Sequence, residues 1–188
     1  MKILILGLGY VGTANAVLLS QQNEVVCYDL NADRINLIND KKSPIEDKEV
    51  SKYLSQKNLN LKGVSEFPSQ DDFDFIVIAT PTNYDPDTNY FDTSTVESCI
   101  ENLYSQNSKA TIVIRSTLPV GFIERVQKKY SSQEIIFVPE FLREGKALLD
   151  SLYPSRIVVG SHSDQAKKFA ELLVEGATIK EVEVLYTK

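Results

Sequence analysis

Short runs of apolar, β-branched residues alternate along the chain with longer segments in which apolar residues recur at helical spacing. The runs with strand character are Lys2–Leu6, Glu24–Asp29, Leu59–Val64, Phe73–Ala79, Thr111–Ser116, Glu134–Val138, Arg156–Val159 and Val182–Tyr186. The segments with helical spacing are Val11–Gln21, Asp33–Asn39, Glu46–Gln56, Asp92–Gln106, Gly121–Tyr130, Lys146–Leu152 and Asp164–Glu175. Regular alternation of the two patterns predicts βαβ units and therefore an α/β fold.

Several of the predicted strands are apolar at every position, as in Ile3–Leu6 and Ile76–Ala79. Solidly apolar strands are typical of a parallel sheet that helices cover on both faces. We therefore expect a Rossmann-like, doubly wound, mostly parallel sheet. The segment Asn83–Tyr90 is rich in Pro, Asp and Asn and is predicted to be a loop. Because the 188 residues contain no repeat or linker, we expect a single domain over residues 1–188.

Composition narrows the class of partner. The formal net charge is −6 and there is no dense Lys/Arg run, which argues against a nucleic-acid or anionic-membrane surface and favours a small-molecule partner. The opening apolar run is too short for a signal peptide, and no stretch approaches about 18 apolar residues, so we expect a cytoplasmic protein. Cys27 and Cys99 lie among apolar residues and are predicted to be inert core thiols. No cluster has zinc-ligand spacing, so no metal is predicted.

The segment Gly7–Gly12 has the pattern G-x-G-x-x-G directly after an apolar strand and at the start of a helix. In that setting Gly7 permits the tight turn, Gly9 lets a pyrophosphate approach the backbone, and Gly12 allows the helix to pack closely on the sheet. The free N–H groups of the helix would bind the phosphates without a basic side chain. The alternative, an ordinary strand-to-helix turn, would not require the acidic residue that follows.

That acidic residue is Asp29, at the end of the second predicted strand and within the window expected for a carboxylate that contacts the adenosine ribose. A carboxylate at this position favours NAD over NADP, because it repels the 2′-phosphate. Arg34 lies just beyond and leaves the other choice open, either as a contact for that phosphate or as an exposed helix cation.

Three further segments follow predicted strands, at the sheet edge where open α/β proteins bind ligands: Ala79–Thr82, Ser116–Pro119 and Pro139–Glu144. The first two place hydroxyl groups beside prolines, which suits either a phosphate or ribose contact or an ordinary turn.

In the third segment, Glu140 and Glu144 are four residues apart, which on a helix would place both on one face. Paired carboxylates can transfer protons or position water, and Arg143 between them could contact an anion. The alternative interpretation is a solvated helix face.

The segments GLGYVG, ATPTNYDPDTNYFDTSTVE, STLPVGF and PEFLREGKALLDSLYPSRIVVG together resemble the UDP-glucose/GDP-mannose dehydrogenase family, in particular its bacterial UDP-glucose 6-dehydrogenases. The resemblance spans nearly the whole chain. It implies an enzyme that oxidises C6 of a nucleotide sugar twice, from alcohol through aldehyde to acid. The family uses two NAD and a covalent thioester to a cysteine, which water then hydrolyses.

The resemblance also implies roles for individual residues. The residues that would contact NAD are Gly7, Gly9, Tyr10, Val11, Gly12 and Asp29, with Arg34 nearby and Thr82 and Thr117 close to the nicotinamide half. The residues that would line the sugar-nucleotide site are Glu140, Phe141, Leu142, Arg143 and Glu144. Among these, Thr117, Glu140 and Glu144 are the expected catalytic residues, because the two carboxylates would place substrate and catalytic water beside the threonine.

The chain departs from the family pattern in one important respect. Family members are considerably longer and carry a lysine and an asparagine on a central helix, a G-G-x-C nucleophile motif and an aspartate, none of which occurs here. We therefore expect the N-terminal NAD-binding half of a homodimeric dehydrogenase, inactive by itself. Two alternatives stay open: a non-catalytic dinucleotide-binding or sensor module, and a dehydrogenase of another sugar such as GDP-mannose or a UDP-N-acetyl amino sugar.

Overall fold

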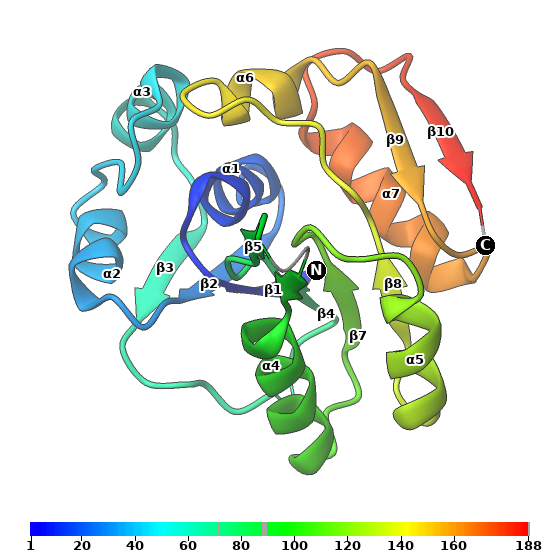
Figure 1. Cartoon of the computed structure of the whole chain (residues 1–188). Helices are drawn as coiled ribbons and strands as arrows, with labels where there is room; N and C mark the ends of the chain where they lie inside the picture. The colour runs from blue at the N-terminus through cyan, green and yellow to red at the C-terminus, as the bar shows by residue number, and fades with distance from the viewer. Residues whose placement is uncertain (71, 88–89, 188) are drawn as a thin grey trace.

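The central feature of the fold is a six-stranded parallel sheet with the strand order β3-β2-β1-β4-β7-β8 (Figure 1). The computed structural model describes residues 1–70, 72–87 and 90–187. The six strands are β1 (Lys2–Leu6), β2 (Glu24–Tyr28), β3 (Leu61–Val64), β4 (Phe75–Ile78), β7 (Thr111–Ile114) and β8 (Ile135–Phe137). The direction of strand order reverses between β1 and β4, which is the arrangement of a Rossmann fold. The predicted doubly wound fold is confirmed.

Helices cover both faces of this sheet (Figure 1). The helices on one face are α1 (Tyr10–Leu19), α2 (Ala32–Asn39), α3 (Lys48–Gln56), α6 (Ala147–Leu152) and α7 (Asp164–Gly176). The helices on the other face are α4 (Ser94–Ser105) and α5 (Phe122–Lys129). The sheet is therefore the middle of three layers, with a separate apolar core on each side.

The alternation of side chains along each strand explains why the strands are apolar throughout. In β1, Ile3 and Ile5 pack into the core beneath α1 and α7, whereas Leu4 and Leu6 pack into the core beneath α4 and α5. All four side chains are at most 1% exposed. Because successive residues of a strand point to opposite faces, a strand with two covered faces needs an apolar residue at every position.

Two features of the fold differ from the sequence prediction. The last two strands, β9 (Arg156–Val159) and β10 (Glu183–Tyr186), pair with each other in a separate two-stranded parallel sheet. This small sheet stays close to the main one, because the Gly160 N–H donates to the Phe137 carbonyl at 2.8 Å. The chain therefore forms one continuous structure, but not one continuous sheet.

The second difference is in the region predicted to be a loop, Asn83–Tyr90. A short antiparallel hairpin starts there, formed by β5 (Asn83–Asp85) and β6 (Tyr90–Asp92), with Thr88 and Asn89 outside the described residues. The rings of Tyr84 and Phe91 lie 4.8 Å apart across the hairpin. This cross-strand aromatic pair stabilises strand pairing in a segment whose composition favours turns.

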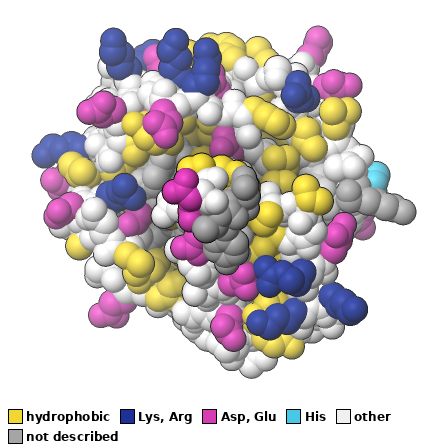
Figure 2. Space-filling model, viewed as in Figure 1, with side chains coloured by type: hydrophobic (Ala, Val, Ile, Leu, Met, Phe, Trp, Pro, Cys, Tyr) yellow, Lys and Arg dark blue, Asp and Glu magenta, His cyan; other side chains and the backbone are white. Residues whose placement is uncertain are grey.

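The surface in Figure 2 carries charges of both signs, with small groups of Lys and Arg over α3 and α5 separated by acidic and polar side chains. Within residues 1–70, 72–87 and 90–187, no helix is long and apolar enough to cross a membrane. The apolar side chains of the helices pack instead on the sheet.

Candidate functional site

The segment Gly7–Gly12, which we call the glycine loop, lies at the carboxyl end of β1, next to the end of β4. Gly7 has φ +95°, in the left-handed region, and its N–H donates to the Tyr28 carbonyl at 2.9 Å. A Cβ atom at Gly7 would lie 2.7 Å from the Ala79 carbonyl oxygen. Both the turn and the close approach to the end of β4 therefore require glycine here. The loop opens at the position where strand order reverses, which is where open α/β sheets bind ligands.

Gly9 is the N-cap residue of α1 and has no side chain with which to cap the helix. The N-cap makes no side-chain hydrogen bond, and the first turn contains no acidic residue. A Cβ atom built on Gly9 would meet no atom within 4 Å. The space beside Gly9 is therefore open, and Gly9, Tyr10 and Val11 at the start of α1 line a cavity, where the first N–H groups and the positive end of the helix dipole suit a phosphate.

Gly12 faces the opposite way, into the protein. A Cβ atom on Gly12 would lie 1.8 Å from the Gly7 carbonyl oxygen and 3.3 Å from the Ala79 Cβ. Gly12 therefore fixes how closely α1 packs on the loop and the sheet, as the sequence pattern predicts.

Asp29 follows β2 directly and is bonded to the glycine loop. Its Oδ2 accepts from the Leu8 N–H at 2.6 Å, and its Oδ1 accepts from the Asn31 N–H at 2.8 Å. The Arg34 guanidinium lies 3.5 Å from Oδ2, with the Asp29 side chain 10% exposed. A carboxylate has about four acceptor sites, so capacity for a ribose hydroxyl remains. The sequence left two roles open for Arg34, a contact for a 2′-phosphate or an exposed helix cation. In the structure its guanidinium instead pairs with Asp29.

A cavity of about 340 Å³ brings most of the predicted site residues together. The site residues predicted from the sequence that line this cavity are Gly7, Gly9, Tyr10, Val11, Asp29, Arg34, Thr82, Thr117, Glu140 and Glu144. A second cavity of about 530 Å³ shares Gly7, Asp29 and Arg34 with the first and extends to Tyr28 and Phe67. The two cavities form one cleft along the carboxyl edge of the sheet, which we call the cofactor cleft.

The segment Pro139–Glu144, which we call the strip, is not helical, so Glu140 and Glu144 do not share a helical face as their spacing would allow on a helix. The Glu140 carboxylate accepts from the Leu142 N–H at 2.7 Å, a local bond that replaces helical hydrogen bonding. Gly145 directly after the strip has φ +75° and turns the chain into α6. The two carboxylates nevertheless line the same cavity.

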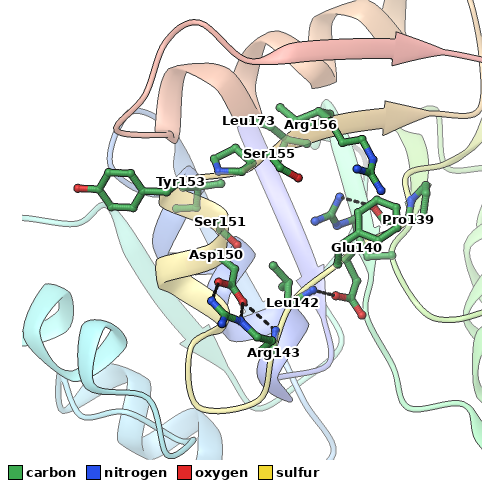
Figure 3. A pocket seen from close by; sticks show the side chains of 15 residues that line it. Pro139, Glu140, Leu142, Arg143, Asp150, Ser151, Tyr153, Ser155, Arg156 and Leu173 are labelled. Atoms are coloured by element: carbon green, nitrogen blue, oxygen red, sulfur yellow. Dashed lines mark hydrogen bonds and ion pairs between the residues drawn. The ribbon is translucent and has the colours of Figure 1, made fainter.

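The remaining strip residues line a different cavity, of about 220 Å³, which we call the strip cavity. Figure 3 shows Arg143 pointing at Asp150, with Nη2 2.6 Å from Oδ1 and Nε 3.1 Å from Oδ2. This ion pair holds the pKa of Asp150 below its ordinary value. Phe141 is 58% exposed, with the Arg156 guanidinium 4.9 Å from its ring. Leu142 and Glu140 also line the strip cavity, and Glu140 lines the cofactor cleft as well.

Arg115 is the site residue that sequence reasoning missed. It is only 7% exposed and lines both the cofactor cleft and the strip cavity. Burial lowers its pKa to about 10, so the guanidinium stays charged at neutral pH. The available signal was a basic residue that ends a solidly apolar strand immediately before Ser116 and Thr117.

Neither cysteine has the properties of an activated nucleophile. Burial raises the pKa of the Cys27 thiol, and it raises the pKa of the half-buried Cys99 to about 11. Both are therefore protonated at neutral pH, whereas the reactive form of cysteine is the thiolate. Among the described residues, no three His, Cys, Asp or Glu side chains are grouped so that they could hold a metal ion.

Taken together, a glycine turn at the strand-order reversal, an uncapped helix start and a carboxylate at the end of β2 define a dinucleotide-binding Rossmann domain. Residues 1–178 match the UDP-glucose/GDP-mannose dehydrogenase family, NAD binding domain. The chain belongs to this family, and the matched part is the domain that binds its NAD cofactor. The resemblance and the cofactor inferred from the sequence are confirmed.

Two curated relatives carry the name UDP-glucose 6-dehydrogenase. The Streptococcus pneumoniae protein is 49% identical over 98% of this chain and 49% of its own length. The Campylobacter jejuni protein is 43% identical over 99% of this chain and 48% of its own length. A solved ternary complex of GDP-mannose dehydrogenase from Pseudomonas aeruginosa superimposes with a TM-score of 0.85 at 25% identity, over 100% of this chain and 46% of that chain. The chain thus spans about half the length of the relatives it matches.

Proposed function

We propose that this chain is the cofactor-binding domain of an enzyme that oxidises UDP-glucose to UDP-glucuronate in two NAD-dependent steps. The names of the relatives at 49% and 43% identity support this substrate over GDP-mannose, whose dehydrogenase is 25% identical. In this proposal residues 1–188 form one NAD-binding domain, and the thioester-forming cysteine comes from a part of the family architecture that this sequence does not include. The complete enzyme would act as a homodimer in the cytoplasm.

The observation that carries the proposal is the cofactor cleft, which joins the glycine loop to Thr117, Glu140 and Glu144. The start of α1 would hold the pyrophosphate, and Asp29 would accept from the adenosine ribose. Bound NAD supplies a hydride acceptor, and its nicotinamide would lie at the end of the cleft that Thr82 and Thr117 line. The oxidised carbon would then lie beside the two carboxylates.

The strip then supplies the polar groups of the reaction. In the proposed mechanism Glu144, exposed at the edge of the cleft, and Glu140, half-buried and oriented by the Leu142 N–H, position substrate and water together with the Thr117 hydroxyl. Phe141, Leu142 and Arg143 would line the sugar-nucleotide side. Because Arg143 is engaged by Asp150, its role would be to hold the strip in place beside the substrate.

The direct test is cofactor binding by the chain alone. We expect NADH to bind, with NAD preferred over NADP, and no sustained NADH production from UDP-glucose, because both thiols are protonated and at least half-buried. Isothermal titration calorimetry measures the first expectation, and NADH absorbance over time measures the second. Absence of NADH binding would contradict the proposed function, and so would steady turnover of UDP-glucose by this chain.

Gly9→Val separates folding from cofactor binding. A side chain at Gly9 enters open space in the free protein, so the thermal midpoint should stay close to that of the wild type. The same side chain occupies the space in front of the helix start, and we expect NADH affinity to fall by about tenfold or more. Gln165→Val, at an exposed first-turn position of α7, is the matched control and should leave NADH affinity unchanged. Equal NADH affinity in the two variants would refute the phosphate site.

A further inference from the structure

Arg115 is a buried cation that lies between the two cavities. It follows β7 directly, and its backbone N–H donates to the Ile78 carbonyl at 2.9 Å. Its Nη1 lies 3.2 Å from the Val138 carbonyl and 3.5 Å from the Pro139 carbonyl, at the start of the strip. The guanidinium therefore connects the end of one strand to the backbone that leads out of the next.

The surroundings of Arg115 satisfy its hydrogen-bonding capacity only in part. Its Nε is buried and has no hydrogen-bond partner among the residues that the structure describes. Burying a guanidinium without full pairing is unfavourable, and this cost is the reason that its pKa falls to about 10. A residue kept only for packing would not need this charge, because an apolar side chain of similar volume often serves a core at least as well.

The charge that offsets this cost is the carboxylate of Glu140. The attraction between the two groups opposes the effect of burial on Arg115. Glu140 lines the same two cavities as Arg115, and its carboxylate is held locally by the Leu142 N–H. Arg115 thus acts on Glu140 in two ways, through the Val138 and Pro139 carbonyls that precede it in the chain and through direct charge attraction.

We propose that Arg115 is a positioning residue of the active site, whose buried guanidinium holds the start of the strip and keeps the Glu140 carboxylate at the border between the cofactor cleft and the strip cavity. The proposal rests on the proposed function for its catalytic meaning, since Glu140 is there the carboxylate that positions substrate. The positioning itself is a property of this chain that can be measured without a ligand.

The experiment compares three variants by amide hydrogen exchange in NMR, with the Leu142 N–H as the reporter of Glu140. Arg115→Lys keeps the charge, and Arg115→Gln keeps donors for the two carbonyls but removes the charge. Arg125→Gln is the control, because Arg125 forms an exposed ion pair with Glu97 at 3.0 Å on the opposite face of the sheet. We expect Leu142 exchange about tenfold faster in Arg115→Gln, within about threefold of wild type in Arg115→Lys, and unchanged in the control.

Two outcomes would overturn the proposal. If Leu142 exchanges as slowly in Arg115→Gln as in the wild type, the charge does not hold Glu140. If it exchanges about tenfold faster in Arg115→Lys, the retained positive charge does not keep Glu140 in place, and the charge attraction that the proposal requires is refuted even when the Gln variant does not fold. Wild-type NADH titration in parallel separates the two proposals: without NADH binding the proposed function fails, whereas the Leu142 comparison still tests Arg115.

Discussion

Gly12→Ala should lower the free energy of unfolding by about 3 kcal/mol or more and abolish NADH binding. The new Cβ would lie 1.8 Å from the Gly7 carbonyl oxygen and 2.9 Å from the Gly7 carbonyl carbon. Both atoms belong to backbone whose own geometry is fixed by the turn at Gly7, so neither can move aside without opening the loop. Urea denaturation measures the stability, and calorimetric titration of any folded fraction measures the affinity for NADH.

Gly9→Ala is the matched control, because it adds the same methyl group to the same loop. At that position the Cβ meets nothing within 4 Å, so we expect a change in unfolding free energy below about 1 kcal/mol. Equal unfolding midpoints for the Gly12 and Gly9 variants would show that α1 is not packed on the loop as closely as described.

Asp29→Ala should weaken NAD binding by about 10-fold to 100-fold and narrow the preference for NAD over NADP. The variant removes the proposed ribose acceptor and leaves the Leu8 N–H without its 2.6 Å partner, so the glycine loop loses an anchor. It also releases Arg34, whose guanidinium is 3.5 Å from Asp29, to meet a 2′-phosphate. Calorimetric titrations with NAD and NADP give both affinities and their ratio.

Asp33→Ala provides the control for this second prediction. Asp33 is an exposed acid in the first turn of α2, close to Asp29 in sequence. Its removal changes the net charge by the same amount without touching the glycine loop. We expect the ratio of the two affinities to stay constant in this variant, and an unchanged ratio in Asp29→Ala as well would refute the role of Asp29.

The sequence predicted the sheet, the helices and the cofactor loop because each leaves a local signal. Strands covered on two faces are apolar at every position, and the turn between β1 and α1 needs glycine at Gly7 and Gly12 for steric reasons that act over a few residues. The approximate place of the strip was also predictable, since it follows a strand at the ligand-binding edge.

The conformation of the strip was not predictable from spacing, because tertiary contacts decide it. Glu140 and Glu144 have helical spacing, but the bond from the Leu142 N–H to Glu140 and the ion pair of Arg143 with Asp150 hold an irregular chain. Arg115 escaped notice for a related reason. Arg115 is buried where the end of β7 meets the end of β4 at Ile78 and the backbone after β8 at Val138, and the sequence around it shows only a basic residue at a strand end.

The two roles of Asp29 have a consequence for attempts to change the cofactor specificity of this domain from NAD to NADP. One carboxylate both anchors the Leu8 amide and, as proposed, recognises the ribose, so cofactor choice and loop architecture cannot be redesigned independently. A side chain that removes the negative charge and offers no acceptor oxygen, such as alanine, would admit the 2′-phosphate into a loosened loop. Successful exchange requires a side chain at this position, such as asparagine, that is neutral yet still offers an oxygen to the Leu8 N–H.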